Sequence, residues 1–121
     1  VNSAGGLDEL STEGPNHVAL LRGGAIVPGT LDATTVGLDA APVGALRGGD
    51  PGENAAFVHA ILSGERGARR DVVLLNAGMA LSLAGAAADL SEGIARAAES
   101  IDSGAARRVL QDAIAFSGGA A

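Results

Sequence analysis

The sequence predicts an α/β fold in which short strands and a β-hairpin come first and about four helices follow. Two short apolar runs, at residues 17–21 and 25–27, flank Arg22 and a Gly-Gly pair, which is typical of a hairpin. A helix start signal appears at Asp50, and apolar residues then recur at helical spacing as far as Ile114. The chain has 121 residues, which is the size of one domain, and nothing in it indicates two.

Composition excludes several classes of function. With 14 acidic against 8 basic residues the net charge is −6, so the chain repels phosphate backbones and we expect no nucleic-acid partner. There are no cysteines, which excludes disulfides and thiolate zinc sites and fits a cytoplasmic protein. The longest apolar run is interrupted by Asn76 and Ser82 and is shorter than the roughly 20 residues of a membrane span, so we expect no membrane partner.

The first element is the end of a strand at Val1–Ala4, after which Gly5 and Gly6 release the chain into a loop. This loop, "GGLDELSTEGP", carries adjacent carboxylates at Asp8 and Glu9 and is too rich in Gly, Ser, Thr and Pro to be a helix. Loops that follow strand ends are where α/β folds place their chemistry. The acidic pair is therefore the first candidate for a functional site.

The hairpin is expected at His17–Leu21 and Ala25–Val27. Residues 30–49 show little periodicity and many turn residues, which predicts irregular structure with one helical turn at Ala33–Val36. This stretch separates the strands from the helices.

Four helices are expected in the second half of the chain. The first has Asp50 as N-cap, Pro51 at its first position, Glu53 completing a capping box and Gly64 as its stop. Its apolar face comprises Ala55, Val58, Ile61 and Leu62. The second, Asp71–Ala84, is apolar on nearly every side and is predicted to be the central core helix.

The third and fourth helices are amphipathic. The third is capped by Asp89 or Ser91, and the fourth by Ser103. Their apolar stripes comprise Ile94, Ala97, Ala98 and Ile101 in the third, and Ala106, Val109, Leu110, Ala113 and Ile114 in the fourth. The final "FSGGAA" is expected to be a frayed tail, and the short strands cannot cover all these apolar faces.

Several ordered blocks carry a resemblance to one family. "GLDELSTEGP", "LRGGDPGENA", "RDVVLLNAGMAL" and "EGIARAAESIDSGAA" are similar, in this order and spacing, to C-terminal motifs of anthranilate phosphoribosyltransferases. The resemblance implies the C-terminal part of the large domain of the nucleoside phosphorylase/phosphoribosyltransferase fold, with residues 1–121 forming a single partial domain. The helical N-terminal domain and the family's upstream motifs have no counterpart here, so we expect a piece of a longer chain.

The resemblance also implies an activity. Such an enzyme of tryptophan biosynthesis transfers phosphoribosyl from phosphoribosyl pyrophosphate to anthranilate with Mg²⁺, giving N-(5-phosphoribosyl)anthranilate and pyrophosphate. It implies Asp8 and Glu9 as metal ligands, substrate-binding residues upstream of this segment, and a cytoplasmic homodimer formed through the absent N-terminal domain. We expect the 121-residue chain alone to be inactive, and no catalytic residue is assigned within it.

Magnesium chemistry suits an acidic pair. Mg²⁺ takes oxygen ligands, keeps several waters and is typically held by one or two carboxylates plus substrate phosphates. Neighbouring side chains on extended backbone point in opposite directions, so the loop must turn for Asp8 and Glu9 to face one ion directly. Without the resemblance, the same residues would be read as solvated loop acids or as a cap.

The other polar residues are interpreted structurally. Ser11 and Thr12 are expected to bond the backbone of their own loop, and His17 and His59 to be surface or partly buried. Asn76 needs a buried hydrogen-bond partner, and Gly78 permits close helix packing. The arginines of this part of the chain, Arg47 in "RGGD" and the cluster Arg66, Arg69 and Arg70, are assigned to a helix start and to a solvated loop, respectively.

Two alternatives stay open at this level. The chain would be a packing module that completes a larger fold and has no active site of its own. Otherwise it would belong to a related phosphorylase or phosphoribosyltransferase with another acceptor, because the residues that select the acceptor are expected upstream.

Overall fold

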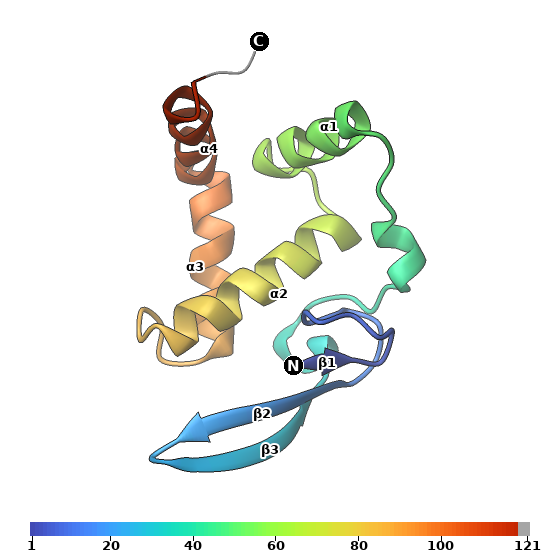
Figure 1. Cartoon of the computed structure of the whole chain (residues 1–121), viewed down its shortest axis with the longest axis vertical. Helices are drawn as coiled ribbons and strands as arrows, with labels where there is room; N and C mark the ends of the chain where they lie inside the picture. The colour runs from blue at the N-terminus through green and yellow to red at the C-terminus, as the bar shows by residue number, and fades with distance from the viewer. Residues whose placement is uncertain (119–121) are drawn as a thin grey trace.

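The computed structural model describes residues 1–118, so the last three residues of the expected frayed tail lie outside the described part. A small antiparallel sheet at one end is followed by two short 3₁₀ helices and four α-helices (Figure 1). The strands are β1 (Asn2–Ser3), β2 (Asn16–Arg22) and β3 (Ala25–Leu31). The helices are η1 (Ala33–Val36), η2 (Val43–Leu46), α1 (Pro51–Leu62), α2 (Ala68–Leu83), α3 (Leu90–Asp102) and α4 (Ala105–Phe116).

The sheet has the order β1-β2-β3, and its longer part is the expected hairpin. Arg22 pairs with Ala25 across a two-residue turn in which Gly23 and Gly24 have φ values of 57° and 81°. This is the positive-φ turn that matches the twist of the flanking strands. The hairpin lies below the helices in the view of Figure 1, and Val18 and Leu31 near its base pack against the core.

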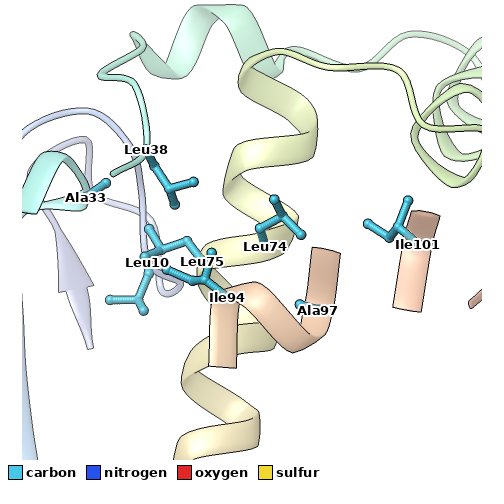
Figure 2. Packing of buried hydrophobic residues seen from close by; sticks show 8 residues of the cluster. All are labelled: Leu10, Ala33, Leu38, Leu74, Leu75, Ile94, Ala97 and Ile101. Atoms are coloured by element: carbon cyan, nitrogen blue, oxygen red, sulfur yellow. The ribbon is translucent and has the colours of Figure 1, made fainter. Parts of the chain in front are cut away.

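The core lies where the loop after β1, the η1 region, α2 and α3 meet (Figure 2). Its buried members are Leu10, Ala33, Leu38, Leu74, Leu75, Ile94, Ala97 and Ile101. One of them, Leu10, directly follows the acidic pair, so the core reaches the backbone of the candidate loop.

Helices α2 and α3 pack closely because each has a glycine at the crossing. A Cβ on Gly78 would lie 2.7 Å from the backbone nitrogen of Ile94, and a Cβ on Gly93 would collide with the carbonyl oxygen of Gly78. The expectation for Gly78 is thus confirmed, and Gly93 is its unforeseen counterpart.

The helix boundaries follow their caps. The capping box of α1 is present: Asp50 Oδ1 accepts from Glu53 N at 2.9 Å, and Glu53 Oε2 accepts from Asp50 N at 2.9 Å. For α3 the cap is Asp89, whose Oδ1 accepts from Glu92 N at 2.9 Å. The helical turn at Ala33–Val36 is confirmed as η1, whereas η2 arises in the stretch expected to be irregular.

Two expectations about the helices, the N-cap of α4 and the enclosure of α2 on nearly every side, are wrong. The N-cap of α4 is Gly104, with φ of 76°, and not Ser103, because only a residue with positive φ turns the chain sharply out of α3. None of the residues of α1 is buried by the described part of the chain. The core helix α2 is covered on one side only, since Val73 and Leu83 are exposed.

Candidate metal site

Asp8 and Glu9 lie side by side in the loop between β1 and β2, and both are exposed. The three residues that follow them are almost completely buried: Leu10, Ser11 and Thr12 are 1%, 0% and 1% exposed. Carboxylates that reach solvent are therefore attached to a backbone that the core holds in place.

The upstream flank of the pair is a tight turn built on Ser3. The Leu7 N–H donates to Ser3 Oγ at 3.0 Å, and the Ser3 N–H donates to the Leu7 carbonyl at 3.1 Å. Gly6 donates its N–H to the Ser3 carbonyl at 2.9 Å and has φ of 79°, which favours glycine. The chain thus reverses direction just before Asp8.

The downstream flank is held by two side-chain amides. Asn76 on α2 accepts from Leu10 N at 3.0 Å and donates to the Leu10 carbonyl at 2.8 Å. Asn16, at the start of β2, accepts from Ser11 N at 2.7 Å and donates to the Ser11 carbonyl at 2.9 Å. The N–H and carbonyl groups of Leu10 and Ser11, the first two buried residues after the acidic pair, are satisfied in this way.

The far end of the loop is bonded to the first residue of η2 and to the segment before it. Glu13 Oε2 accepts from Val43 N at 3.1 Å, and the Thr12 carbonyl accepts from Ala41 N at 3.2 Å. Ser11 Oγ accepts from Glu13 N at 2.9 Å, which confirms its structural interpretation. Thr12 Oγ1 is buried without a partner among residues 1–118, so that expectation fails for Thr12.

The donor set fits magnesium and does not complete its shell. Among residues 1–118, no group of three or more His, Cys, Asp or Glu side chains is placed to hold a metal ion. Two adjacent exposed carboxylates match the one or two protein ligands that Mg²⁺ uses when substrate phosphates and waters supply the rest. His17 and His59 are both exposed; His17 is the second residue of β2, and His59 lies on α1.

The solvated interpretation of the arginine cluster is wrong for Arg70. Its side chain is 5% exposed, and its Nη2 donates to Asp102 Oδ1 at 2.8 Å, joining the start of α2 to the end of α3. Arg69 stacks over the Phe57 ring, 3.8 Å from the centroid, and donates to the Arg47 carbonyl at 3.0 Å. These arginines fasten helices together, because their long side chains can cover apolar surface while the charge finds a partner.

A polar hollow of about 360 Å³ lies beside this ion pair, between the loop after η1 and the ends of α2 and α3. Its walls include Asp39, Asp71 and Arg66. Partial burial, and then the nearby Asp39 carboxylate, raise the pKa of Asp71, while Arg70 and Arg66 oppose the shift. The hollow holds charges of both signs and is separate from the loop residues that carry Asp8 and Glu9.

Sequence reasoning missed the residues that hold the loop. Ser3 and Asn16 are 2% and 0% exposed, yet each lies in a polar stretch that resembles any turn. A partial signal exists for Asn16, because a polar residue just before an apolar strand often closes a turn through its side chain. The partner of Asn76 could not be foreseen, since it lies 66 residues away in the sequence.

Comparison with known proteins supplies the class. Residues 1–107 match the a/b domain of a glycosyl transferase family, and the chain belongs to this family. A solved structure, that of anthranilate phosphoribosyltransferase from Thermus thermophilus, superposes with a TM-score of 0.79 at 38% identity. The superposition covers 92% of this chain and 33% of that one, which confirms the α/β fold expected from the sequence.

Two similar sequences carry the same name as this solved structure. The chain is 52% identical over 117 residues to anthranilate phosphoribosyltransferase of Methylorubrum extorquens strain PA1, covering 97% of this chain and 35% of the relative. It is 49% identical over 118 residues to the protein of the same name from Pelotomaculum thermopropionicum, and the match covers 98% of this chain and 34% of that relative. The chain thus spans about a third of the length of the relatives that it matches.

No helix among residues 1–118 is long and apolar enough to cross a bilayer.

Proposed function

We propose that this chain is the C-terminal part of the large domain of an anthranilate phosphoribosyltransferase and that Asp8 and Glu9 hold its Mg²⁺. The observation that carries the proposal is an exposed Asp-Glu pair whose backbone is fixed on both flanks, in a segment about half identical to enzymes of that name. Bound Mg²⁺ would neutralise charge on the pyrophosphate that leaves the ribose. The substrates are phosphoribosyl pyrophosphate and anthranilate, and their other contacts belong to the upstream two thirds.

The chain's own contribution is presentation of the two carboxylates. Both side chains are exposed, so a cation in solution has access to their carboxylate oxygens. The fixed backbone lowers the entropy lost when they bind an ion. A cytoplasmic location and a homodimer formed outside this segment complete the proposal and follow from the same likeness.

The test is a chimera in which this chain replaces the matched third of the Methylorubrum extorquens relative. Its rate of anthranilate consumption is measured with phosphoribosyl pyrophosphate over a range of Mg²⁺ concentrations. For the double variant Asp8→Ala, Glu9→Ala we expect a loss of at least about 100-fold at low Mg²⁺, since even the outer partners of metal ligands contribute 10- to 100-fold.

The matched control removes two exposed acids elsewhere. Glu99 on α3 and Asp112 on α4 are exposed, so Glu99→Ala, Asp112→Ala changes the net charge equally and should leave the rate and its Mg²⁺ dependence unchanged. Equal turnover by the unmodified chimera and by the Asp8, Glu9 variant would refute the metal role. An unmodified chimera that folds and does not consume anthranilate would refute the activity itself and favour the packing-module alternative.

A further inference from the structure

Asn76 lies in the middle of α2 and contacts the loop that carries the acidic pair. We propose that Asn76 is a positioning residue for this loop: its side-chain amide fixes the backbone of Leu10 and thereby the direction in which the preceding Glu9 carboxylate is presented to the metal. The inference rests on the proposed metal role of Asp8 and Glu9 and assigns a task to a residue outside their loop.

The hydrogen bonds use both N–H donors of the amide group and one of the two lone pairs of its oxygen. Asn76 Oδ1 accepts from Leu10 N at 3.0 Å, and Nδ2 donates to the Leu10 carbonyl at 2.8 Å. The second Nδ2 hydrogen goes back to the Val72 carbonyl, one turn earlier in α2, at 3.0 Å. A flipped amide would place its oxygen against two carbonyls, so the network defines one orientation of the side chain.

The bond to Val72 makes the amide rigid. It holds the Asn76 side chain against its own helix, so the amide atoms that bond Leu10 have a fixed position relative to α2. Leu10 is also anchored by its side chain, which is 1% exposed and packs in the core with Leu75. Backbone and side chain of Leu10 are thus held independently, and Glu9 is one peptide bond away.

A purely structural role is the competing explanation. Loss of Asn76 would leave the N–H and carbonyl of Leu10 without partners in a partly buried place and would lower stability in either case. Only the positioning role predicts that the affinity of the acidic pair for Mg²⁺ falls as well. The experiment must therefore measure Mg²⁺ binding separately from stability and from turnover.

The deciding variant is Asn76→Asp in the same chimera. The carboxylate has the shape of the amide and still accepts from Leu10 N, but its second oxygen replaces a donor and faces the carbonyls of Leu10 and Val72. Mg²⁺ is titrated calorimetrically in the presence of pyrophosphate, which supplies phosphate oxygens, and the heat of Mg²⁺ binding to pyrophosphate alone is subtracted. We expect the Mg²⁺ affinity to fall about 10-fold, the lower end of the effect of outer-sphere partners.

Two controls separate the explanations. Asn54 brackets Gly49 in the same way, with bonds of 2.9 and 3.0 Å to its N–H and carbonyl, but it lies on α1. Asn54→Asp should therefore leave the Mg²⁺ affinity unchanged. Gly78→Ala should destabilise the crossing of α2 and α3 without contacting Leu10. The Mg²⁺ affinity of this variant should also be unchanged when it is measured well below the unfolding temperature.

An Mg²⁺ affinity of Asn76→Asp within twofold of the unmodified chimera, whatever its stability, overturns the positioning role. If Asn76→Asp does not fold, Asn76→Gln takes its place, since it keeps a neutral amide and displaces it by one methylene, and the same 10-fold loss is expected. Failure of Asp8→Ala, Glu9→Ala to change the affinity would instead overturn the proposed metal site, so the two failures are distinguishable.

Discussion

At the scale of single residues, side-chain amides take the place that a neighbouring strand would fill. The Asn16 side chain is fully buried. It accepts from Ser11 N and donates to the carbonyls of Ser11 and Leu31, so it connects the loop to β3. Asn76 does the same for Leu10 from α2. Buried backbone groups need partners, and a loop inside a core obtains them from side chains.

The two side chains of the Arg70–Asp102 ion pair differ strongly in their exposure to solvent. The Arg70 side chain is 5% exposed and that of Asp102 is 52% exposed, and Arg70 Nη1 has no partner among residues 1–118. We predict that Asp102→Ala lowers the stability of the chimera by about 2 kcal/mol, less than for a fully buried pair, because it leaves a buried guanidinium unpaired. Arg70→Met should cost less, since water solvates the remaining Asp102. Thermal unfolding checks the order, and a larger loss for Arg70→Met would contradict it.

Glu92 gives a pH-dependent prediction. The hydrogen bond from the Ala88 N–H, and then the Arg96 guanidinium, lower the pKa of Glu92 below its ordinary value of 4.5. A carboxyl with a lowered folded-state pKa stabilises the fold above its unfolded pKa and loses that contribution as pH falls through the folded value. Glu92→Gln keeps an acceptor for Ala88 and removes the charge. Its unfolding temperature should therefore be lower than that of the unmodified chimera at pH 7, with the gap closing below about pH 4.5.

The matched control for this prediction is Glu99→Gln on the same helix, because Glu99 is exposed and its carboxylate makes no hydrogen bond within residues 1–118. We expect little change at either pH. A gap for Glu92→Gln that stays constant from pH 7 to pH 3 would show that charge is not what stabilises the start of α3.

At the scale of elements, the close crossing of α2 and α3 organises the helical half of the chain. Gly78 and Gly93 allow backbone to meet backbone there, which brings Ile94 and Ala97 into the core beside Leu74 and Leu75. A glycine in a helix costs about 1 kcal/mol relative to alanine, so each must be compensated by packing.

Gly93→Ala tests this compensation. Helix propensity alone would stabilise the variant by about 1 kcal/mol, but the new Cβ would collide with the Gly78 carbonyl, which is backbone and cannot turn away. We predict a net loss of about 2 kcal/mol, measured as a lower thermal unfolding temperature of the chimera. Gly52→Ala on α1 is the control, because its Cβ would meet only the Asp50 carboxylate, at 3.2 Å, and should change stability by less than about 1 kcal/mol. A stabilised Gly93→Ala variant would mean that the crossing adjusts easily.

Local sequence signals predicted the helices and strands. Contacts between residues far apart in the sequence determined which side chains are buried, and local signals could not predict these contacts. The hairpin, the capping box at Asp50 and the stripe of α3 depend on neighbours within a few residues, and the structure confirms them. The burial of Arg70 depends on Asp102, 32 residues later, and its charge pattern alone looked like that of a solvated loop. Amphipathic periodicity likewise predicts an apolar face without saying whether this chain covers it, as α1 and α4 show.

At the scale of the whole molecule, the sequence predicted which residues could bind a metal, but it did not predict which elements hold their loop in place. The adjacent acids Asp8 and Glu9 and the turn-forming glycines could be read in the sequence, and the structure places the pair on an exposed turn. The side chains that hold this turn come from β1, β2 and α2, and no periodic pattern indicates that these elements meet. Whether both carboxylates bind one ion stays a prediction for the chimera to test.

The described part of the chain leaves much apolar surface uncovered. The exposed apolar side chains include Leu21 and Ile26 on the hairpin, Leu83 on α2, and Val109, Ile114 and Phe116 on α4, with Phe116 96% exposed. A groove of about 720 Å³, lined mainly by apolar residues, lies among α2, α3 and the start of α4. An open groove with a mainly apolar lining marks a region that binds other protein or exposes the chain to aggregation.

We therefore predict that the isolated 121-residue chain binds the dye ANS strongly and unfolds with low cooperativity, and that the chimera does neither. The matched chain spans about a third of its relatives, so the upstream two thirds of the chimera offer a surface for these side chains. Val109→Ser, Ile114→Ser on α4 makes the test specific: it should reduce dye binding by the isolated chain and lower the stability of the chimera by about 2 kcal/mol, as expected when two buried aliphatic side chains are replaced. If the double variant leaves the chimera's stability unchanged, the apolar face of α4 is exposed to water in the chimera. In that case this face must bind a partner other than the upstream two thirds.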